Sequence, residues 1–238
     1  MSARLQEYID AGYTSVEGWL DREILSLLPV LDEFQQKHRI VGDFCEIGVH
    51  HGRLFFALAN LCSGSDGLAL DVFDDQQLNI DRSGHGNRAI FESGIQQYCP
   101  DPARIRVEKV DSTDIRAREL LQGSAFRLFS VDGGHTVQHL INDLSLADAT
   151  LVNGGFVLVD DYCSPGFPGV TEGLILYLQR GGRLLPVCAA GGKMILTTLS
   201  FAAHAQAFLA ARLRESAQKY RIRETALCGH KYLVYRKL

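Results

Sequence analysis

The sequence predicts an α/β protein built on a doubly wound, mostly parallel sheet. Short apolar runs alternate with stretches of helical periodicity, and several runs are followed directly by acidic residues. The clearest pair is Phe126–Val131, which precedes Asp132, and Phe156–Val159, which precedes Asp160 and Asp161. Parallel strands joined by a crossover helix end at the same edge of a sheet, where ligands bind in open α/β folds. The three carboxylates should therefore meet in space.

Converging carboxylates repel one another, and an unpaired buried charge is costly. A divalent cation that prefers oxygen ligands, such as Mg²⁺ or Mn²⁺, resolves this repulsion. In the alternative interpretation, the acids at the strand ends cap the following helices or remain solvated. That alternative is stronger for Asp132 alone than for Asp132 together with the adjacent pair Asp160 and Asp161.

A glycine-containing turn follows the first predicted strand, Phe44–Ile47, and precedes a predicted helix over Arg53–Leu61. Glycines at such a turn let a ligand approach the backbone, and the start of the helix presents free amides. The turn suits a nucleotide or a nucleoside. Its spacing, Glu46-x-Gly48-x-x-x-Gly52, lacks the GxGxxG fingerprint of dinucleotide sites. Two glycines also occur in tight turns for steric reasons alone.

The next two predicted strands, Gly67–Leu70 and Ile105–Val110, also end in acid. Asp71 is placed to accept hydrogen bonds from ribose hydroxyls, unless it is a solvated turn residue. Asp111 could accept a hydrogen bond from the exocyclic amine of adenine. Equally, Asp111 and the residues just after it could cap the helix that follows.

The length and composition of the chain favour one domain with a large core. The 238 residues are 46% hydrophobic and carry a formal net charge of −4, which argues against a general nucleic-acid binder. No apolar run approaches the roughly 18 residues of a membrane span, and the N-terminus lacks the pattern of a signal peptide. The six cysteines are scattered, with no CxxC pair, as in reduced proteins. We therefore expect a cytoplasmic protein without membrane or nucleic-acid partners.

Five motifs in order, EIGVHHG, ALDVF, VDSTD, FSVDGGHT and GGFVLVDDY, resemble those of class I S-adenosylmethionine-dependent methyltransferases. The resemblance spans roughly residues 41–180. It implies a Rossmann-like, mostly parallel seven-stranded sheet with an antiparallel terminal hairpin. Apolar residues at helical spacing predict a helical segment over residues 1–40, which precedes the cofactor-binding part, residues 41–238, within a single domain. The residues implied at the cofactor are Glu46, Gly48, Val49, His50 and Gly52 around its amino-acid part, Asp71 and Val72 at the ribose, and Asp111 and Ser112 near the adenine.

The acidic trio resembles that of metal-dependent O-methyltransferases, both the catechol and caffeoyl-CoA type and the macrolide-sugar type. In those families one acid after the fourth strand and an adjacent pair after the fifth hold magnesium, which implies metal ligation by Asp132, Asp160 and Asp161. The DGGH element is similar to the sugar-modifying branch and to its relatives named after cephalosporin hydroxylase. The catechol branch often has lysine where His135 stands, and this difference argues against a phenolic substrate.

Methyl transfer to a hydroxyl requires activation of a poor nucleophile, because a hydroxyl holds its proton near neutral pH. A bound Mg²⁺ lowers the pKa of the hydroxyl, and a base then takes its proton. His135 lies three residues after Asp132, so we expect these two residues to be catalytic, with His135 as the base or as its partner. Alternatively, His135 is a histidine at a helix start that bonds only to the backbone.

The sequence therefore predicts a Mg²⁺-dependent O-methyltransferase that acts on a hydroxylated small molecule, such as a sugar or a glycosylated natural product. A nicotinamide-dependent oxidoreductase is an alternative, against which the missing GxGxxG weighs. A catalytically silent binding protein is another, against which three repelling carboxylates weigh. The long polar segment from Asp74 to Gly86 is expected to fold over the ligands as a lid. Homo-oligomers are expected from the resemblance, because relatives are often dimers or larger.

Overall fold

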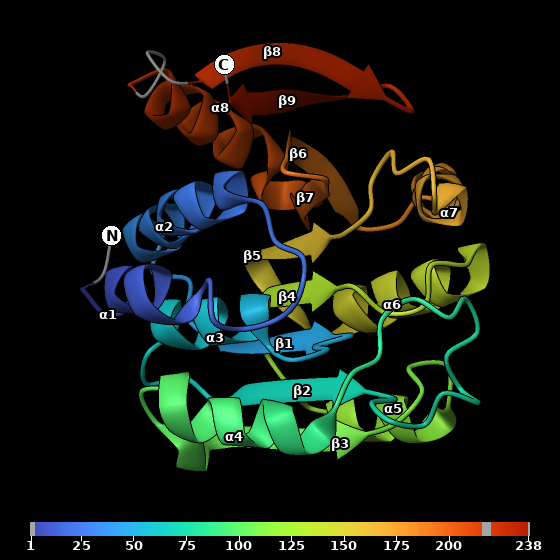
Figure 1. Cartoon of the computed structure of the whole chain (residues 1–238). Coiled ribbons are helices and arrows are strands. Elements are labelled where there is room, and N and C mark those ends of the chain that lie inside the picture. The colour runs from blue at the N-terminus through green and yellow to red at the C-terminus, as the bar shows by residue number, and fades with distance from the viewer. Residues whose placement is uncertain (1–2, 216–219, 238) are drawn as a thin grey trace.

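One central sheet of nine strands organises the computed structural model, which describes residues 3–215 and 220–237 (Figure 1). The strand order is β3-β2-β1-β4-β5-β7-β6-β9-β8, and β1 to β5 pair in parallel. Residues 1–2, 216–219 and 238 of the predicted segments lie outside the described residues. The strands are β1 Asp43–Ile47, β2 Gly67–Asp71, β3 Ile105–Lys109, β4 Phe126–Val131, β5 Leu151–Val159, β6 Leu184–Ala190, β7 Lys193–Thr198, β8 Tyr220–Leu227 and β9 His230–Lys237.

The mixed edge of the sheet is wider than the sequence predicts. β7 runs antiparallel to both β5 and β6, which confirms the predicted hairpin. β9 then pairs in parallel with β6, and β8 pairs antiparallel with β9 at the outer edge. The prediction of seven strands therefore omits this second hairpin. β8 carries charged side chains at Arg221, Arg223 and Glu224, so it has no apolar run that would reveal it.

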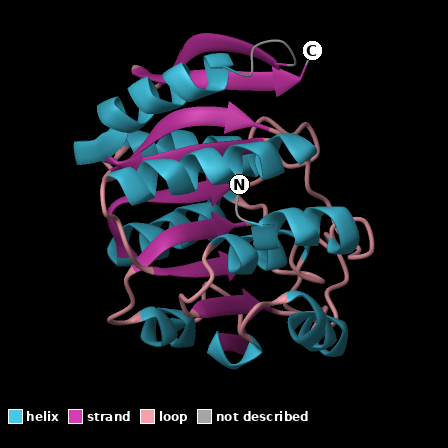
Figure 2. Cartoon of the chain, turned by 90° about the vertical axis from the view of Figure 1, so that its left-hand side faces the viewer, coloured by secondary structure: helices cyan, strands magenta, loops and turns pink. Residues whose placement is uncertain are grey.

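Helices cover both faces of the sheet (Figure 2). The helices are α1 Ala3–Glu7, the π-helix η1 Tyr8–Gly12, α2 Arg22–Lys37, α3 Arg53–Leu61, α4 Arg88–Tyr98, the 3₁₀-helix η2 Pro102–Arg104, α5 Ile115–Leu121, α6 Val137–Thr150, α7 Pro168–Gln179 and α8 Leu199–Glu215. Side-chain oxygens cap three of these helices, because Asn87, Asp114 and Thr136 accept hydrogen bonds from backbone N–H groups of the first turns of α4, α5 and α6. Within the segment Asp111–Asp114, which the sequence allows as a cap for the following helix, Asp114 is the residue that caps α5.

Alternating side chains of the buried strands build one core on each face of the sheet. Along β4, Leu128 packs in the cluster that contains residues of α2, α3, α4 and α8, whereas Phe129 packs in the cluster of α5, α6 and α7. Leu5 and Ile24 of the N-terminal helices belong to the first cluster, so residues 3–37 pack directly on the sheet domain. Burial on both faces explains why β1, β2, β4 and β5 are largely apolar, whereas β3 at the edge of the sheet is less buried and carries Arg106, Glu108 and Lys109.

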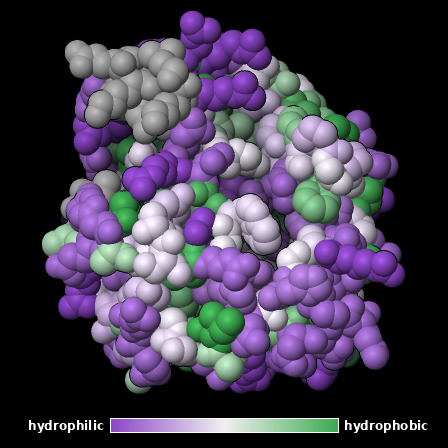
Figure 3. Space-filling model, viewed as in Figure 1, coloured by the Kyte–Doolittle hydropathy of each residue, from purple (hydrophilic) through white to green (hydrophobic). Residues whose placement is uncertain are grey.

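The face of the molecule seen in Figure 3 is mostly hydrophilic, with hydrophobic side chains in small, separate groups. Among the described residues, no helix combines the length and the apolar character that a membrane crossing requires.

Replacing Asp143 of α6 by asparagine is expected to stabilise the protein at neutral and alkaline pH. Burial raises the pKa of Asp143 to about 7, although hydrogen bonds from Ser112 and Asn142 act to lower it. The folded state therefore keeps a proton that the unfolded state releases above pH ~4, so wild-type stability falls as the pH rises toward 7. An amide cannot ionise, and the advantage of D143N over the wild type should grow by about 3 kcal/mol between pH 5 and pH 8.

Urea unfolding at the two pH values measures this difference, with D101N, a substitution of an exposed acid, as the control. An advantage of D143N that is equal at pH 5 and pH 8 would show that Asp143 ionises normally in the fold.

Candidate active site

A pocket of about 540 Å³ lies at the carboxyl ends of β1, β2, β4 and β5. In open α/β sheets this edge is the usual ligand site. The sequence-predicted residues that line it are Glu46, Gly48, Val49, His50, Asp71, Val72, Asp111, Ser112, Asp132, His135, Asp160 and Asp161. Gly52 does not line the pocket. A Cβ atom there would lie 2.5 Å from the ring of Phe56, so Gly52 serves the packing of α3.

Gly48 brings the end of β1 against the end of β4. Its backbone adopts φ +84°, and its N–H donates to the carbonyl of Leu70 over 2.8 Å. A Cβ atom at this position would lie 1.8 Å from the backbone carbonyl oxygen of Asp132. Only glycine fits, because the obstacle is backbone and cannot rotate away.

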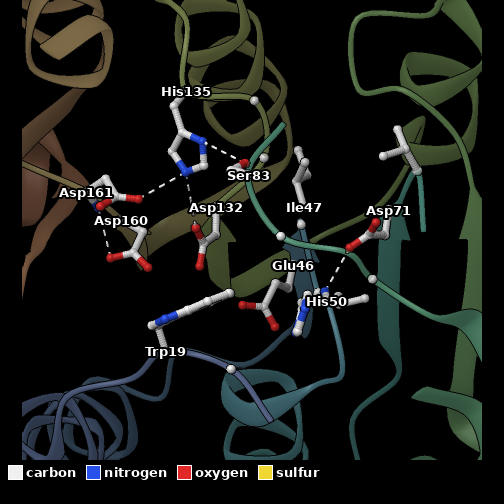
Figure 4. A pocket seen from close by; sticks show the side chains of 18 of the residues that line it. Trp19, Glu46, Ile47, His50, Asp71, Ser83, Asp132, His135, Asp160 and Asp161 are labelled. Carbon is white, nitrogen blue, oxygen red and sulfur yellow. Dashed lines mark hydrogen bonds and ion pairs between the residues drawn. The ribbon is translucent and has the colours of Figure 1, made fainter. Parts of the chain in front are cut away.

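Asp71 ends β2 and fixes the shape of the glycine turn. Its carboxylate accepts a hydrogen bond from the His50 N–H over 2.8 Å and another from the Phe73 N–H over 2.5 Å (Figure 4). Burial raises the pKa of Asp71, and these backbone hydrogen bonds oppose that effect. The carboxylate thus lies in the wall of the pocket and ties the turns after β1 and β2 together.

Glu46 is buried in the floor of the pocket with an exposed fraction of 2%. Burial raises its pKa to about 8, against the opposing charge of Lys193. Its Oε2 has no hydrogen-bond partner among the described residues. A buried acceptor without a partner is costly unless a ligand supplies a donor. The amino group of S-adenosylmethionine would be such a donor, so this orphaned atom fits that cofactor.

Asp111 forms a local turn rather than a helix cap. Its Oδ1 accepts hydrogen bonds from the N–H and the hydroxyl of Thr113, each over 2.8 Å. Asp111 and its neighbour Ser112 both line the pocket. His139 approaches the same carboxylate, with 3.8 Å between its Nε2 and Asp111 Oδ1.

The acids after β4 and β5 meet around one histidine (Figure 4). The Nε2 atom of His135 lies 3.0 Å from Asp161 Oδ2 and 3.9 Å from Asp132 Oδ1. Burial disfavours the charged imidazolium, but hydrogen bonds to Asp161 and Asp81 outweigh it and raise the pKa of His135 to about 9. Burial and the nearby charge of Asp160 raise the pKa of Asp132 well above its usual value.

Lys193 is a functional candidate that the sequence reasoning missed. It begins β7, is 1% exposed, and its Nζ forms an ion pair with Asp160. The same Nζ lies 3.5 Å from Asp132 Oδ2. Although burial raises the pKa of Asp160, the charge of Lys193 together with hydrogen bonds from Asp132, Lys193 and the backbone N–H of Asp161 outweighs it and lowers that pKa. A lysine directly before the apolar run Met194–Leu196 is the signal that could have revealed it.

A divalent cation fits the remaining donors. Asp132, His135 and Asp161 each offer one ligand atom, and these atoms lie within 4.8 Å of one another. Asp132 carries a destabilised charge, as its raised pKa shows, so a cation would relieve it. The structure brings Asp132 and Asp161 of the predicted trio together beside His135, whereas Asp160 faces Lys193.

Two segments far apart in sequence complete the pocket. Residues 17–21, between η1 and α2, contribute Trp19, the only tryptophan of the sequence. Trp19 is 73% exposed, and its ring centroid lies 5.4 Å from that of His50. The loop of residues 72–87, between β2 and α4, contains the predicted lid segment, and many of its side chains line the pocket.

At this edge of the sheet, three residues have backbone conformations that residues other than glycine rarely adopt. His50, Phe73 and Asp161 have φ values of +50°, +48° and +54°. All three line the pocket. Such conformations persist only where the surroundings impose them, and they concentrate at functional sites.

Residues 45–162 match the model of a family described as Methyltransferase domain, Methyltransf_24. The matched segment contains the glycine turn, Asp71, Asp111 and all three acids of the cluster. A comparison with curated proteins gave no match.

Solved structures share the fold at low sequence identity. One is CalS11, a TDP-rhamnose 3′-O-methyltransferase of calicheamicin biosynthesis, with a TM-score of 0.54, 16% identity, and coverage of 81% of this chain and 86% of that one. Another is MycE of the mycinamycin pathway, solved with Mg, SAH and mycinamycin VI, with a TM-score of 0.55, 16% identity, and coverage of 83% and 55%.

A third is a putative caffeoyl-CoA O-methyltransferase from Staphylococcus aureus, with a TM-score of 0.56, 12% identity, and coverage of 83% of this chain and 93% of that one. These likenesses show the fold, and the segment that matches the family model contributes most of the residues that line the pocket. Residues 45–162 therefore form a methyltransferase domain of this family.

Proposed function

We propose that the protein is an O-methyltransferase that uses Mg²⁺ or Mn²⁺ and methylates a hydroxyl of a small molecule, such as a sugar or a glycosylated natural product. The observation that carries this proposal is the cluster of Asp132, His135 and Asp161, which shares one pocket with the Gly48 turn. CalS11 and MycE, which share the fold, are named for sugar and macrolide substrates, and MycE was solved with Mg.

The cofactor would lie along the ends of β1 to β4. Glu46 offers an acceptor for its amino group, Asp71 a carboxylate beside the ribose, and Asp111 with Ser112 a polar wall for the adenine. Gly48 lines the pocket, and the turn that it begins would lie beside the cofactor's amino-acid part. These roles are proposals that rest on the placement of the residues in the pocket.

Asp132 and Asp161 would hold the cation, with Asp160 and His135 beside them. A bound Mg²⁺ or Mn²⁺ lowers the pKa of a hydroxyl that coordinates it. Lys193 keeps one positive charge next to Asp160 and so reduces the repulsion within the cluster.

His135 would take the proton of the hydroxyl at Nε2. The hydroxyl oxygen then bonds to the methyl carbon as the carbon–sulfur bond breaks, and that bond's electron pair stays on sulfur, which leaves S-adenosylhomocysteine. To accept a proton, His135 must be neutral, and its pKa of about 9 in the protein without a cation favours the charged form. A cation on Asp161 would compete with the imidazolium for the same carboxylate.

Titration calorimetry of S-adenosylmethionine and Mn²⁺, separately and together, tests the proposal, with Trp19 fluorescence as a second readout because its ring lines the pocket. We expect the wild type to bind both, and the D132A/D161A variant to lose Mn²⁺ affinity by at least about 100-fold while it keeps the cofactor. D101A, which removes an exposed acid, should behave as the wild type.

A wild type that binds the cofactor but no metal would contradict the metal dependence. A wild type that binds NADH and not S-adenosylmethionine would contradict the whole proposal. Where both ligands bind, formation of S-adenosylhomocysteine with nucleotide sugars and glycosylated macrolides identifies the acceptor class.

A further inference from the structure

The loop of residues 72–87 reaches His135 through Asp81. The Oδ2 atom of Asp81 accepts a hydrogen bond from the backbone N–H of His135 over 2.6 Å and lies 2.7 Å from its ring Nδ1. The exposed fractions of the two side chains are only 15% and 10%. Since 54 residues separate them in the sequence, this contact depends on the position of the loop.

The carboxylate of Asp81 is itself held in place. Its other oxygen, Oδ1, accepts hydrogen bonds from the N–H of Ser83 over 3.0 Å and from the hydroxyl of Ser83 over 2.5 Å. Asn79 in turn donates to the carbonyls of Ser83 and Gly84. Although burial raises the pKa of Asp81, the hydrogen bonds from Ser83 and His135 outweigh it and hold that pKa well below its usual value.

An ionised carboxylate only accepts hydrogen bonds, so the ring nitrogen that faces Asp81 must carry a proton. When His135 is neutral, its lone pair is then on Nε2, the atom that faces Asp161 and Asp132. Phe167 fixes the plane of the ring, because the two rings stack with centroids 3.9 Å apart at an interplanar angle of 20°. Both the orientation and the tautomer of His135 are thus defined.

We propose that Asp81 is the positioning residue of the catalytic base: it keeps the proton of His135 on Nδ1 and turns Nε2 toward the acidic cluster. The base is therefore complete only when the loop of residues 72–87 lies over the pocket. This inference rests on the proposed function, in which His135 takes the proton of the acceptor hydroxyl.

The experiment compares D81A and D81N with D74N. Asp74 lies in the same loop but is exposed, does not line the pocket and pairs with Lys109 at 3.4 Å, so D74N is the matched control. In D81N the side-chain oxygen can still accept from both His135 donors, so this variant preserves the geometry and removes the charge. This orientation is favoured over the flipped one, because it satisfies both His135 donors and the hydroxyl of Ser83 can turn to accept from the amide, which leaves only the Ser83 N–H without its acceptor.

The first readout needs no acceptor substrate. It is the ¹⁵N chemical shifts of the His135 ring nitrogens, measured in histidine-labelled protein at a pH where His135 is neutral. The H135Q variant assigns these signals. We expect protonated Nδ1 in the wild type, D74N and D81N, and a shift toward protonated Nε2 in D81A. The second readout is methyl transfer. We expect kcat to fall by about 10- to 100-fold in D81A, with partial recovery in D81N and an unchanged Kd for S-adenosylhomocysteine.

The same tautomer in D81A as in the wild type would overturn the inference, and so would a kcat of D81A equal to that of D74N. A wild type that binds no S-adenosylhomocysteine would contradict the proposed function instead, and the tautomer measurement would still decide whether Asp81 positions the ring.

Discussion

Replacing Gly48 by alanine is expected to destabilise the protein by about 3 kcal/mol or more and to abolish cofactor binding. The added Cβ would meet the carbonyl oxygen of Asp132 at 1.8 Å and its carbonyl carbon at 2.4 Å. Both atoms are backbone, so β1 and β4 must separate at the edge where the pocket lies. Thermal unfolding and calorimetric titration of S-adenosylhomocysteine measure the two effects.

G64A is the matched control, because Gly64 has a similar φ of +94° but no atom within 4 Å of an added Cβ. G64A should lower the free energy of unfolding by only about 1 kcal/mol, the cost of a positive φ for alanine. Its affinity for S-adenosylhomocysteine should be unchanged. Equal losses of stability in G48A and G64A would show that backbone conformation alone, and not the approach of the two strands, requires glycine at position 48.

Replacing Lys193 by methionine is expected to cost about 3 kcal/mol at neutral pH, because it leaves the partly buried carboxylate of Asp160 without its fully buried partner. The buried pairing raises the pKa of Lys193 above its usual value. The contribution of the lysine is therefore complete below its unfolded pKa of about 10.4 and declines only as the pH rises beyond it. Denaturant unfolding at pH 7 measures the loss.

K109M provides the control, because Lys109 pairs with Asp74 at 3.4 Å on the surface, where an ion pair contributes about 0–1 kcal/mol. The double variant K193M/D160N should recover part of the stability, since it removes the isolated charge together with its partner. If K193M and K109M were equally stable, the ammonium of Lys193 would not be holding Asp160 in the folded protein.

The sequence predicts the parallel part of the sheet well because most of its strands are buried on both faces and are largely apolar. Once the order of strands and helices is known, the acids that follow Val131 and Val159 must share an edge, and the structure places them there. The position of Asp71 beside the glycine turn follows from the same rule. The catalytic and binding roles that were assigned to residues from the sequence remain predictions, which the proposed experiments test.

Contacts between distant segments could not be predicted from local pattern. Lys193 lies in a hairpin whose register against β5 decides whether it faces solvent or the acids. Asp81 lies in an irregular loop without periodicity, and its contact with His135 requires the folded course of that loop. A lone lysine or aspartate in a sequence is most often solvated. Only the tertiary structure shows that Lys193 and Asp81 are exceptions.

The unusual backbone angles of His50, Phe73 and Asp161 have a consequence for the evolution of this protein. The positive φ of each of these residues lowers the free energy of unfolding by about 1 kcal/mol relative to glycine. The edge of the sheet that binds ligands is therefore less stable than it could be. The packing of the fully buried Phe73 outweighs this cost, but at residues 50 and 161 a lineage selected only for heat resistance should accumulate glycine and lose turnover as it does so. A lineage that must keep turnover has to gain its heat resistance elsewhere in the molecule.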